Sequence, residues 1–227
     1  MSKIVVPALL LGLASLTHAA RPLTTEDAGV LAAHACEWDS SVAQLRTRGS
    51  ATQNAWSTQI GCGIGFDTQV ALAYSGAESD GEHAYGLTLG GKTGLADGGD
   101  ATASWAVAWG ATFVRQGDLP LYWDAAYLNL VFSKPLSESL TLHANFGWLH
   151  SHVEHHDRAT WNLAGEYALT PQLDATAEIY GYGSQRPWLA AGLRLAASQS
   201  ISLNASYALQ RGRERTGLLT LGLVFAF

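Results

Sequence analysis

The amino-acid sequence predicts an all-β protein, a 12-stranded antiparallel β-barrel that crosses a membrane, and three observations support this fold class. Apolar and polar residues alternate with a period of two from His34 to the C-terminus, which is the pattern of strands rather than helices. Of the 227 residues, 48% are hydrophobic but only 14% are charged, about half the charged share of ordinary soluble domains. No run of about 20 apolar residues follows position 20, so membrane-spanning helices are excluded.

The first 19 residues have the features of a secretory signal peptide. Lys3 precedes an apolar stretch over residues 4–16, and the Thr-His-Ala sequence at 17–19 provides a small-residue cleavage site. Cleavage after Ala19 leaves 12 of the 13 basic residues against 19 acidic ones, a formal net charge of −7. A nucleic-acid partner is therefore disfavoured, because phosphate binding needs a basic surface. We expect the mature chain to leave the cytoplasm.

Residues 20–33 do not alternate cleanly and form a lead-in to the first predicted strand. We assign this lead-in to the periplasm, and insertion into the barrel lumen is the alternative that the sequence leaves open. The barrel itself is expected to occupy residues 34–227.

The alternating pattern divides the barrel region into 12 segments of about ten residues, a length suited to transmembrane strands. In the clearest segment, 201–210, the odd positions are apolar and the even positions are polar or small. The connections after odd-numbered segments, such as 76–81 and 211–215, are expected to be longer and to face outward. The predicted strands are 34–46, 53–64, 67–76, 82–94, 102–114, 122–133, 138–149, 158–169, 172–183, 187–197, 200–210 and 216–227.

The second face of these strands distinguishes a membrane barrel from a secreted β-sandwich, which is the alternative fold. A sandwich would carry abundant Lys and Glu on that face, whereas here it is mostly Ser, Thr, Asn, Gln, Gly and Ala. The apolar face carries aromatic residues toward segment ends, such as Trp56, Trp148 and Tyr207, as in the aromatic girdles of membrane barrels. The sequence therefore favours the barrel.

The chain ends in alternating aromatic residues, Phe225 and Phe227. A terminal aromatic after such a strand resembles the assembly signal of bacterial outer-membrane proteins. We therefore predict a bacterial outer-membrane location, with membrane lipid and the barrel-assembly machinery as partners. We also expect the barrel to be a monomer.

Cys36 and Cys62 each lie 13 residues from Gly49, the centre of the first predicted hairpin, so antiparallel pairing places them opposite one another. The same register pairs Trp38 with Ile60 on one apolar face. Since disulfides persist in exported proteins, we predict a Cys36–Cys62 bridge that staples this hairpin. Two free buried thiols are the alternative.

The mature N-terminus, RPLTTEDA at residues 21–28, is followed by Cys36 and Glu37 at the start of the first strand. In these features the chain resembles the outer-membrane proteins associated with meta-pathway phenol degradation. The resemblance covers the lead-in, the first hairpin and the terminal strand, and the rest matches only as barrel pattern. It implies passage of small organic compounds across the outer membrane, and it supplies no catalytic residues.

Histidines are concentrated in one part of the sequence, where Glu154 also lies. Imidazole groups are common ligands of zinc and copper. No cysteine supports a site there, and a flexible loop holds ligands poorly, so we favour a hydrated loop and assign no metal or cofactor. These residues are His143, His150, His152, His155 and His156.

Polar and charged side chains on the inward face are the candidate lumen lining. On the lipid face each charge would cost about 2–4 kcal/mol at mid-depth, whereas water or an ion-pair partner stabilises it inside. Such residues tune which solutes pass, unless they form a packed ion-pair network that fills the lumen. They are Lys92, His143, Asn145, Glu166, Asp174, Glu178 and Arg194.

The function predicted from these features is an outer-membrane channel or facilitator for small solutes, which include aromatic and other organic compounds if the resemblance holds. Acidic residues outnumber basic ones among the inward charges, which favours cations or neutral polar solutes. A barrel with a filled lumen, serving as a structural or surface protein, is the first alternative. An outer-membrane lipid hydrolase is the second, but it needs a serine held by a histidine on the lipid face, and His143 falls on the inward face. We therefore expect no enzyme activity and assign no catalytic residue.

Overall fold

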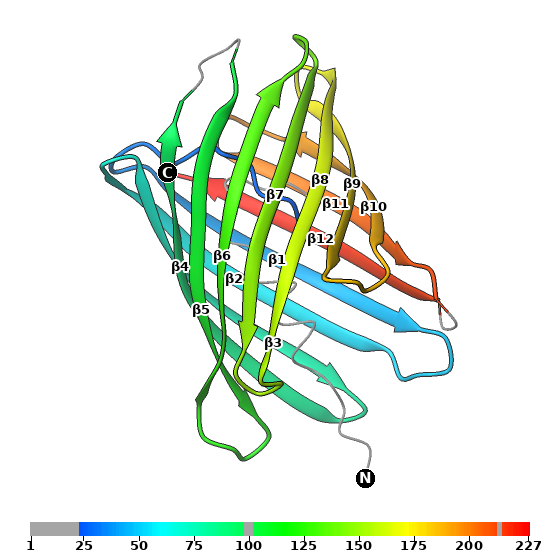
Figure 1. Cartoon of the computed structure of the whole chain (residues 1–227). Coiled ribbons are helices and arrows are strands. Elements are labelled where there is room, and N and C mark those ends of the chain that lie inside the picture. The colour runs from blue at the N-terminus through cyan, green and yellow to red at the C-terminus, as the bar shows by residue number, and fades with distance from the viewer. Residues whose placement is uncertain (1–22, 98–101, 213–214) are drawn as a thin grey trace.

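Twelve antiparallel strands form one closed barrel in the computed structural model, which describes residues 23–97, 102–212 and 215–227 (Figure 1). Each strand pairs with its neighbours in sequence, and β1 pairs with β12, so the sheet has no open edge. The strands are β1 (Cys36–Thr47), β2 (Gln53–Gly65), β3 (Thr68–Ser79), β4 (Glu82–Ala96), β5 (Ser104–Gln116), β6 (Tyr122–Pro135), β7 (Leu140–Ser151), β8 (His156–Thr170), β9 (Leu173–Tyr182), β10 (Trp188–Ala196), β11 (Ile201–Gln210) and β12 (Thr216–Ala226). The predicted fold class is confirmed.

The predicted signal peptide, residues 1–19, lies outside the described residues. Within the described ranges, no helix is long and apolar enough to cross a membrane.

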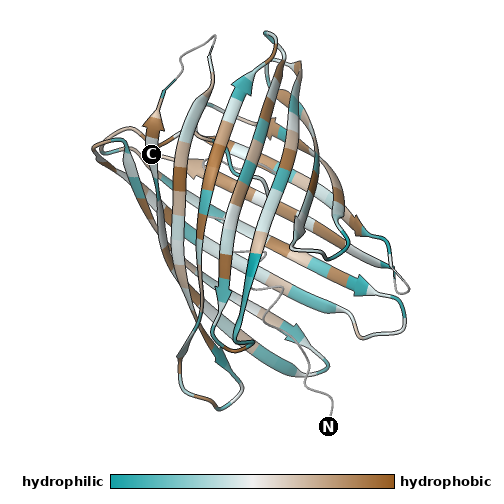
Figure 2. Cartoon of the chain, viewed as in Figure 1, coloured by the Kyte–Doolittle hydropathy of each residue, from teal (hydrophilic) through white to brown (hydrophobic). Residues whose placement is uncertain are grey.

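The period of two separates an outer wall from an inner one. Large apolar side chains stand exposed around the outside, as for Val42, Leu89 and Phe146, which are 55%, 55% and 66% exposed. The intervening residues point inward, and Figure 2 shows hydrophobic and hydrophilic positions alternating along the strands. So large an exposed apolar surface is unfavourable in water and fits contact with lipid.

The connection between the third and fourth strands is shorter than the predicted 76–81, because β3 continues to Ser79 and β4 begins at Glu82. Gly76 lies within the strand, where the Trp56 ring covers it so closely that a Cβ would come within 2.6 Å of the indole Nε1. The turn is only Asp80 and Gly81, and both have positive φ (53° and 78°), as a two-residue hairpin with a type I′ turn requires. The turns at the two ends of the barrel therefore do not differ consistently in length.

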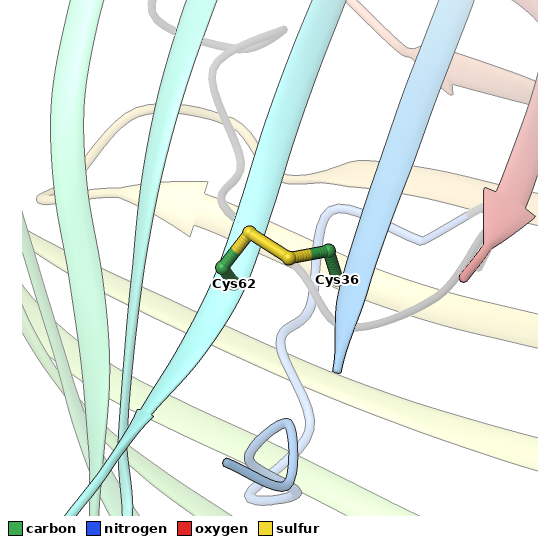
Figure 3. Close-up of a disulfide and its surroundings, with 2 residues drawn as sticks. All are labelled: Cys36 and Cys62. Atoms are coloured by element: carbon green, nitrogen blue, oxygen red, sulfur yellow. A yellow bond between two sulfur atoms is a disulfide. The ribbon is translucent and has the colours of Figure 1, made fainter. Parts of the chain in front are cut away.

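The predicted disulfide is confirmed. Cys36 and Cys62 face one another on β1 and β2 with their Cα atoms 4.2 Å apart, and their sulfur atoms are bonded (Figure 3). The bridge lies at the end of the barrel where the Cys36 N–H donates to the carbonyl of Phe227. We call this the terminal end, and the opposite end, with the turns 48–52, 80–81, 117–121, 152–155, 183–187 and 211–215, the far end.

Candidate functional site

The segment from Leu23 to Ala33, termed the N-terminal segment below, enters the barrel interior. Thr25, Glu26 and Asp27 are 1%, 3% and 4% exposed and contact inward-facing side chains of the strands. Of the two positions considered for residues 20–33, the lumen is the one that Thr24 to Leu31 occupy. Apart from a single bridge between Ala33 and Gly63 of β2, this stretch pairs with no described strand, so its backbone groups need side-chain partners from the wall.

Glu178 on β9 holds the beginning of the N-terminal segment. Its carboxylate accepts hydrogen bonds from the backbone N–H of Thr24 (2.8 Å) and of Thr25 (2.9 Å), and from the Thr25 hydroxyl (2.8 Å). Glu178 is only 6% exposed. A buried carboxylate is stable when several donors replace water, and such charge-assisted bonds are among the stronger hydrogen bonds in proteins.

Asn145 on β7 holds the middle of the segment by pairing with the backbone of Glu26 in both directions. Its Oδ1 accepts from the Glu26 N–H (2.7 Å), and its Nδ2 donates to the Glu26 carbonyl (2.9 Å). On β6, Ser133 Oγ accepts from the Ala28 N–H (2.8 Å) and lies 2.8 Å from His143 Nδ1. His143 therefore supports the segment through Ser133.

Lys92 on β4 holds the next part of the segment. Its side chain is fully buried, and Nζ donates to the Asp27 carbonyl (2.8 Å) and lies 3.9 Å from the Asp27 carboxylate. On β3, Gln69 Oε1 accepts from the Leu31 N–H (2.9 Å). A buried ammonium without such partners would be costly, so Lys92 and the segment stabilise one another.

A second group of predicted lumen residues forms an ion-pair cluster. Arg194 on β10 donates from Nε to Asp174 Oδ2 (2.9 Å) and from Nη2 to Glu166 Oε1 (3.1 Å). The seven predicted lumen residues therefore divide into four that support the N-terminal segment and three that pair with one another. Because these carboxylates are engaged, they give less reason for cation preference than their number suggested.

The strands of the lumen differ in what covers them. Hydrogen bonds from Thr24 to Leu31 reach strands β3, β4, β6, β7, β8 and β9, which we call the packed wall. Strands β11, β12, β1 and β2 form what we call the polar wall, because several of their inward side chains are small, polar and half-buried, so water reaches them. The inward phase of the same strands also carries Glu37 and Asp39 and the apolar Leu45 and Leu218. The small polar residues of the polar wall are Ser41, Ser57, Ser202, Asn204, Ser206 and Thr220.

Three supporting residues were absent from the predicted lumen lining: Gln69, Ser133 and Asn162, whose Nδ2 donates to the Thr24 carbonyl at 3.3 Å. All three occupy the inward phase of their strands, so the period of two was a sufficient signal.

The histidine-rich region lies at the far end of β6 and β7. His150 Nδ1 pairs with Asp157 Oδ1 at 2.8 Å, and the rings of His150 and His152 stack on Trp123 with centroids 5.5 and 5.1 Å away. In the part of the chain that the structure describes, no group of His, Cys, Asp and Glu is arranged to hold a metal ion.

Sequence and fold comparisons relate this barrel to known proteins. Residues 8–227 match the family described as Uncharacterised conserved protein UCP029691. The chain belongs to this family. No curated protein matches the sequence significantly.

Several solved barrels share the fold at low sequence identity. The COG4313 outer-membrane channel from Pseudomonas putida F1 has a TM-score of 0.64 and 12% identity, covering 88% of this chain and 98% of that chain. The KdgM porin, solved in complex with disordered oligogalacturonate, has a TM-score of 0.59 and 6% identity over 83% of this chain and 99% of that chain. The Ralstonia pickettii toluene transporter TbuX has a TM-score of 0.52 and 8% identity over 91% of each chain. The barrel is therefore of the bacterial outer-membrane type, as its apolar outer wall requires.

Proposed function

We propose that this protein is an outer-membrane channel for small solutes and that its path runs between the N-terminal segment and the polar wall. The observation that carries the proposal is the asymmetry of the lumen: among the described residues, Thr24 to Leu31 form hydrogen bonds with the packed wall and none with the small polar side chains of the polar wall. Small side chains such as Ser41, Ser206 and Thr220 occupy little volume and offer hydroxyl groups to a passing solute. Channels, porins and a toluene transporter among the barrels of similar fold support the same function.

The solute class that fits the polar wall is a small, neutral, polar organic molecule. Hydroxyl and amide groups replace part of the hydration of such a solute, and the charges of Arg194, Asp174 and Glu166 pair with one another. Glu37 and Asp39 are the inward carboxylates of the polar wall itself, and they lie toward the terminal end of β1. The resemblance to proteins of phenol degradation points to an aromatic compound with a hydroxyl group. We also propose that the terminal end lies in the periplasm, where the assembly machinery recognises Phe227. We further propose that the barrel is a monomer.

The test is single-channel recording of refolded protein, with Ser206→Trp as the variant. The indole would project from β11 into the open side of the lumen, so conductance should fall by more than half. Tyr207→Trp is the matched control, because Tyr207 is the next residue but faces outward and is 51% exposed. No conductance in correctly folded wild-type barrel would instead support the filled, structural barrel.

The filled barrel has one specific observation in its favour, the dense bonding of the N-terminal segment to the packed wall. The hydrolase alternative has weaker structural support. Ser133 and His143 are hydrogen bonded, but His143 is 1% exposed and Ser133 already accepts the Ala28 N–H inside the lumen. A lipid substrate on the outer wall has no access to this pair, so the proposed function includes no enzyme activity.

A further inference from the structure

A groove of about 420 Å³ lies on the lipid-facing side of the barrel, toward the far end of β12, β1, β2, β3 and β4. Figure 1 shows β12, β1 and β2 side by side, as their register requires. The part of the groove nearest the membrane centre is apolar and includes Val42, Leu219 and Leu221. Its size falls within the range of about 300–1,000 Å³ typical of small-molecule sites.

Packing of the Trp56 ring keeps this groove open. Trp56 lies opposite Val42 across β1 and β2, but its indole turns over Gly76 on the other side. There it meets the Tyr74 ring edge-on, with centroids 5.3 Å apart. The floor beside Val42 is therefore left uncovered, and the aromatic rings form one flank at the level where membrane proteins place Trp and Tyr.

Polarity rises along the outward face of β1 from this apolar floor to the far end. Val42 is followed on the same face by Gln44, whose Nε2 donates to Asn54 Oδ1 at 3.0 Å, and then by exposed Arg46. Beyond the strand, Arg48 N–H donates to the carbonyl of Arg215 at 3.1 Å, which brings the loops of these two arginines together. The order apolar, amide, guanidinium matches the order of groups along a lipid whose headgroup carries phosphate.

Charge at the far end is divided between two sides. Among the described residues, the loops 48–52, 183–187 and 211–215 contain four arginines and no carboxylate. The other three loops contain acidic residues, Asp80, Asp118 and Glu154, and no Lys or Arg. Within the described ranges, neither Arg46 nor Arg48 forms an ion pair with a carboxylate. The basic loops 48–52 and 211–215 lie beside the β12–β1–β2 part of the groove, whereas its β3–β4 part lies beside the acidic loop 80–81 and is lined by Glu78.

We propose that this outer-wall groove binds a phosphorylated, acylated glycolipid of the outer leaflet. An acyl chain would lie along Val42, Leu219 and Leu221, the Gln44–Asn54 pair would meet its ester or amide groups, and Arg46 and Arg48 would bind the headgroup phosphates. Guanidinium groups bind phosphate through paired, charge-assisted hydrogen bonds, and apolar contact supplies the rest of the affinity. The proposal takes the far end as the outer face but does not depend on whether the lumen conducts.

The experiment is native mass spectrometry of the intact barrel released from micelles that contain diphosphorylated lipid A. The double variant Arg46→Gln/Arg48→Gln should bind about ten-fold less lipid, because two surface guanidinium groups no longer attract the phosphates. Val42→Trp, which fills the groove, should reduce binding comparably. Lys134→Gln is the matched control, since Lys134 is an exposed cation on the outward face of β6 at the terminal end, and it should change nothing.

Three further measurements distinguish a lipid headgroup from free phosphate as the bound group and check that the variants are folded. Dephosphorylated lipid A should bind wild-type protein about as weakly as the double variant binds the intact lipid. Inorganic phosphate at equal concentration should not compete, and full competition would overturn the lipid site in favour of a free-phosphate site. Equal binding by wild type and the double variant, both with folded-barrel gel mobility, would also overturn the proposal.

Discussion

The packed wall and the polar wall are built from the same kind of sequence, yet their inward side chains differ in burial and in hydrogen-bond partners. Both alternate outward apolar residues with inward small or polar ones. On the packed wall, the inward Glu178, Asn145 and Lys92 are matched by backbone groups of the N-terminal segment and are buried. On the polar wall, Ser41 bonds only across the sheet to Ser57 (2.8 Å) among its contacts with described residues, and both stay half-buried. An inward polar residue is therefore buried and hydrogen bonded where the N-terminal segment packs against it, and it is exposed to water where the segment does not.

The largest effect on conductance is expected from removing the part of the N-terminal segment that packs against the packed wall. Replacing residues 24–31 with a Gly/Ser linker of equal length should raise single-channel conductance several-fold, because the packed wall would also face water. The linker keeps Cys36 in place, so the disulfide should still form. Replacing residues 117–121 at the far end with the same type of linker serves as the control and should leave conductance nearly unchanged. Equal conductance with and without the segment would show that it does not narrow the path.

The disulfide joins β1 and β2 of the polar wall at the terminal end, and its loss should destabilise the barrel. The bridge joins residues 26 apart, and closing such a loop contributes about 3 kcal/mol on chain-entropy grounds. Cys36→Ser/Cys62→Ser should lower the free energy of unfolding by about that amount in urea titrations of folded barrel. Because the bridge lies on the outward phase, conductance at room temperature should not change, and a large change would place the bridge in the path.

The strands and the disulfide were predictable from sequence, whereas the filling of the lumen was not. Alternation is a local signal, and it identified every strand. The equal distance of Cys36 and Cys62 from Gly49 gave their pairing directly. The connection at 76–81 was predicted too long because Gly76 and Gly81 both look like turn residues, although Gly76 serves to accommodate the Trp56 ring within a strand.

The contacts of the lumen residues depend on parts of the chain that are far apart. Thr24 and Glu178 are 154 residues apart, and Glu26 and Asn145 are 119 apart. The sequence showed that Glu178 and Asn145 face inward, but no periodicity connects them to an irregular segment near the N-terminus. Placement of that segment required the closed barrel, which brings β3 to β9 around it.

A smaller effect is expected from weakening one anchor of the packed wall. Glu178→Gln keeps the size of the side chain but replaces one acceptor oxygen with an amide that cannot accept, so at least one bond to Thr24 or Thr25 is lost. Losing such a bond costs about 1–3 kcal/mol, which should release the start of the segment more often and increase the frequency of brief openings. Glu82→Gln, at an exposed position of the far end, is the control. An unchanged frequency of openings would exclude Glu178 as an anchor.

The smallest effect is expected from pH, through Glu26 in the N-terminal segment. Burial raises the pKa of Glu26 from 4.5 to about 7, opposed by Lys92 and assisted by Asp27, and Tyr127 on the packed wall is the other titratable group that it faces. A raised pKa means that the docked segment prefers the protonated carboxyl, so docking is most stable below about pH 4.5 and weakens as pH rises through about 7. Openings recorded from pH 5 to 8 should become more frequent with rising pH, and Glu26→Gln, which stays neutral, should remove that dependence. If the variant keeps the wild-type pH profile, another group controls the docking of the segment, and the packed wall holds Glu26 equally well in both protonation states.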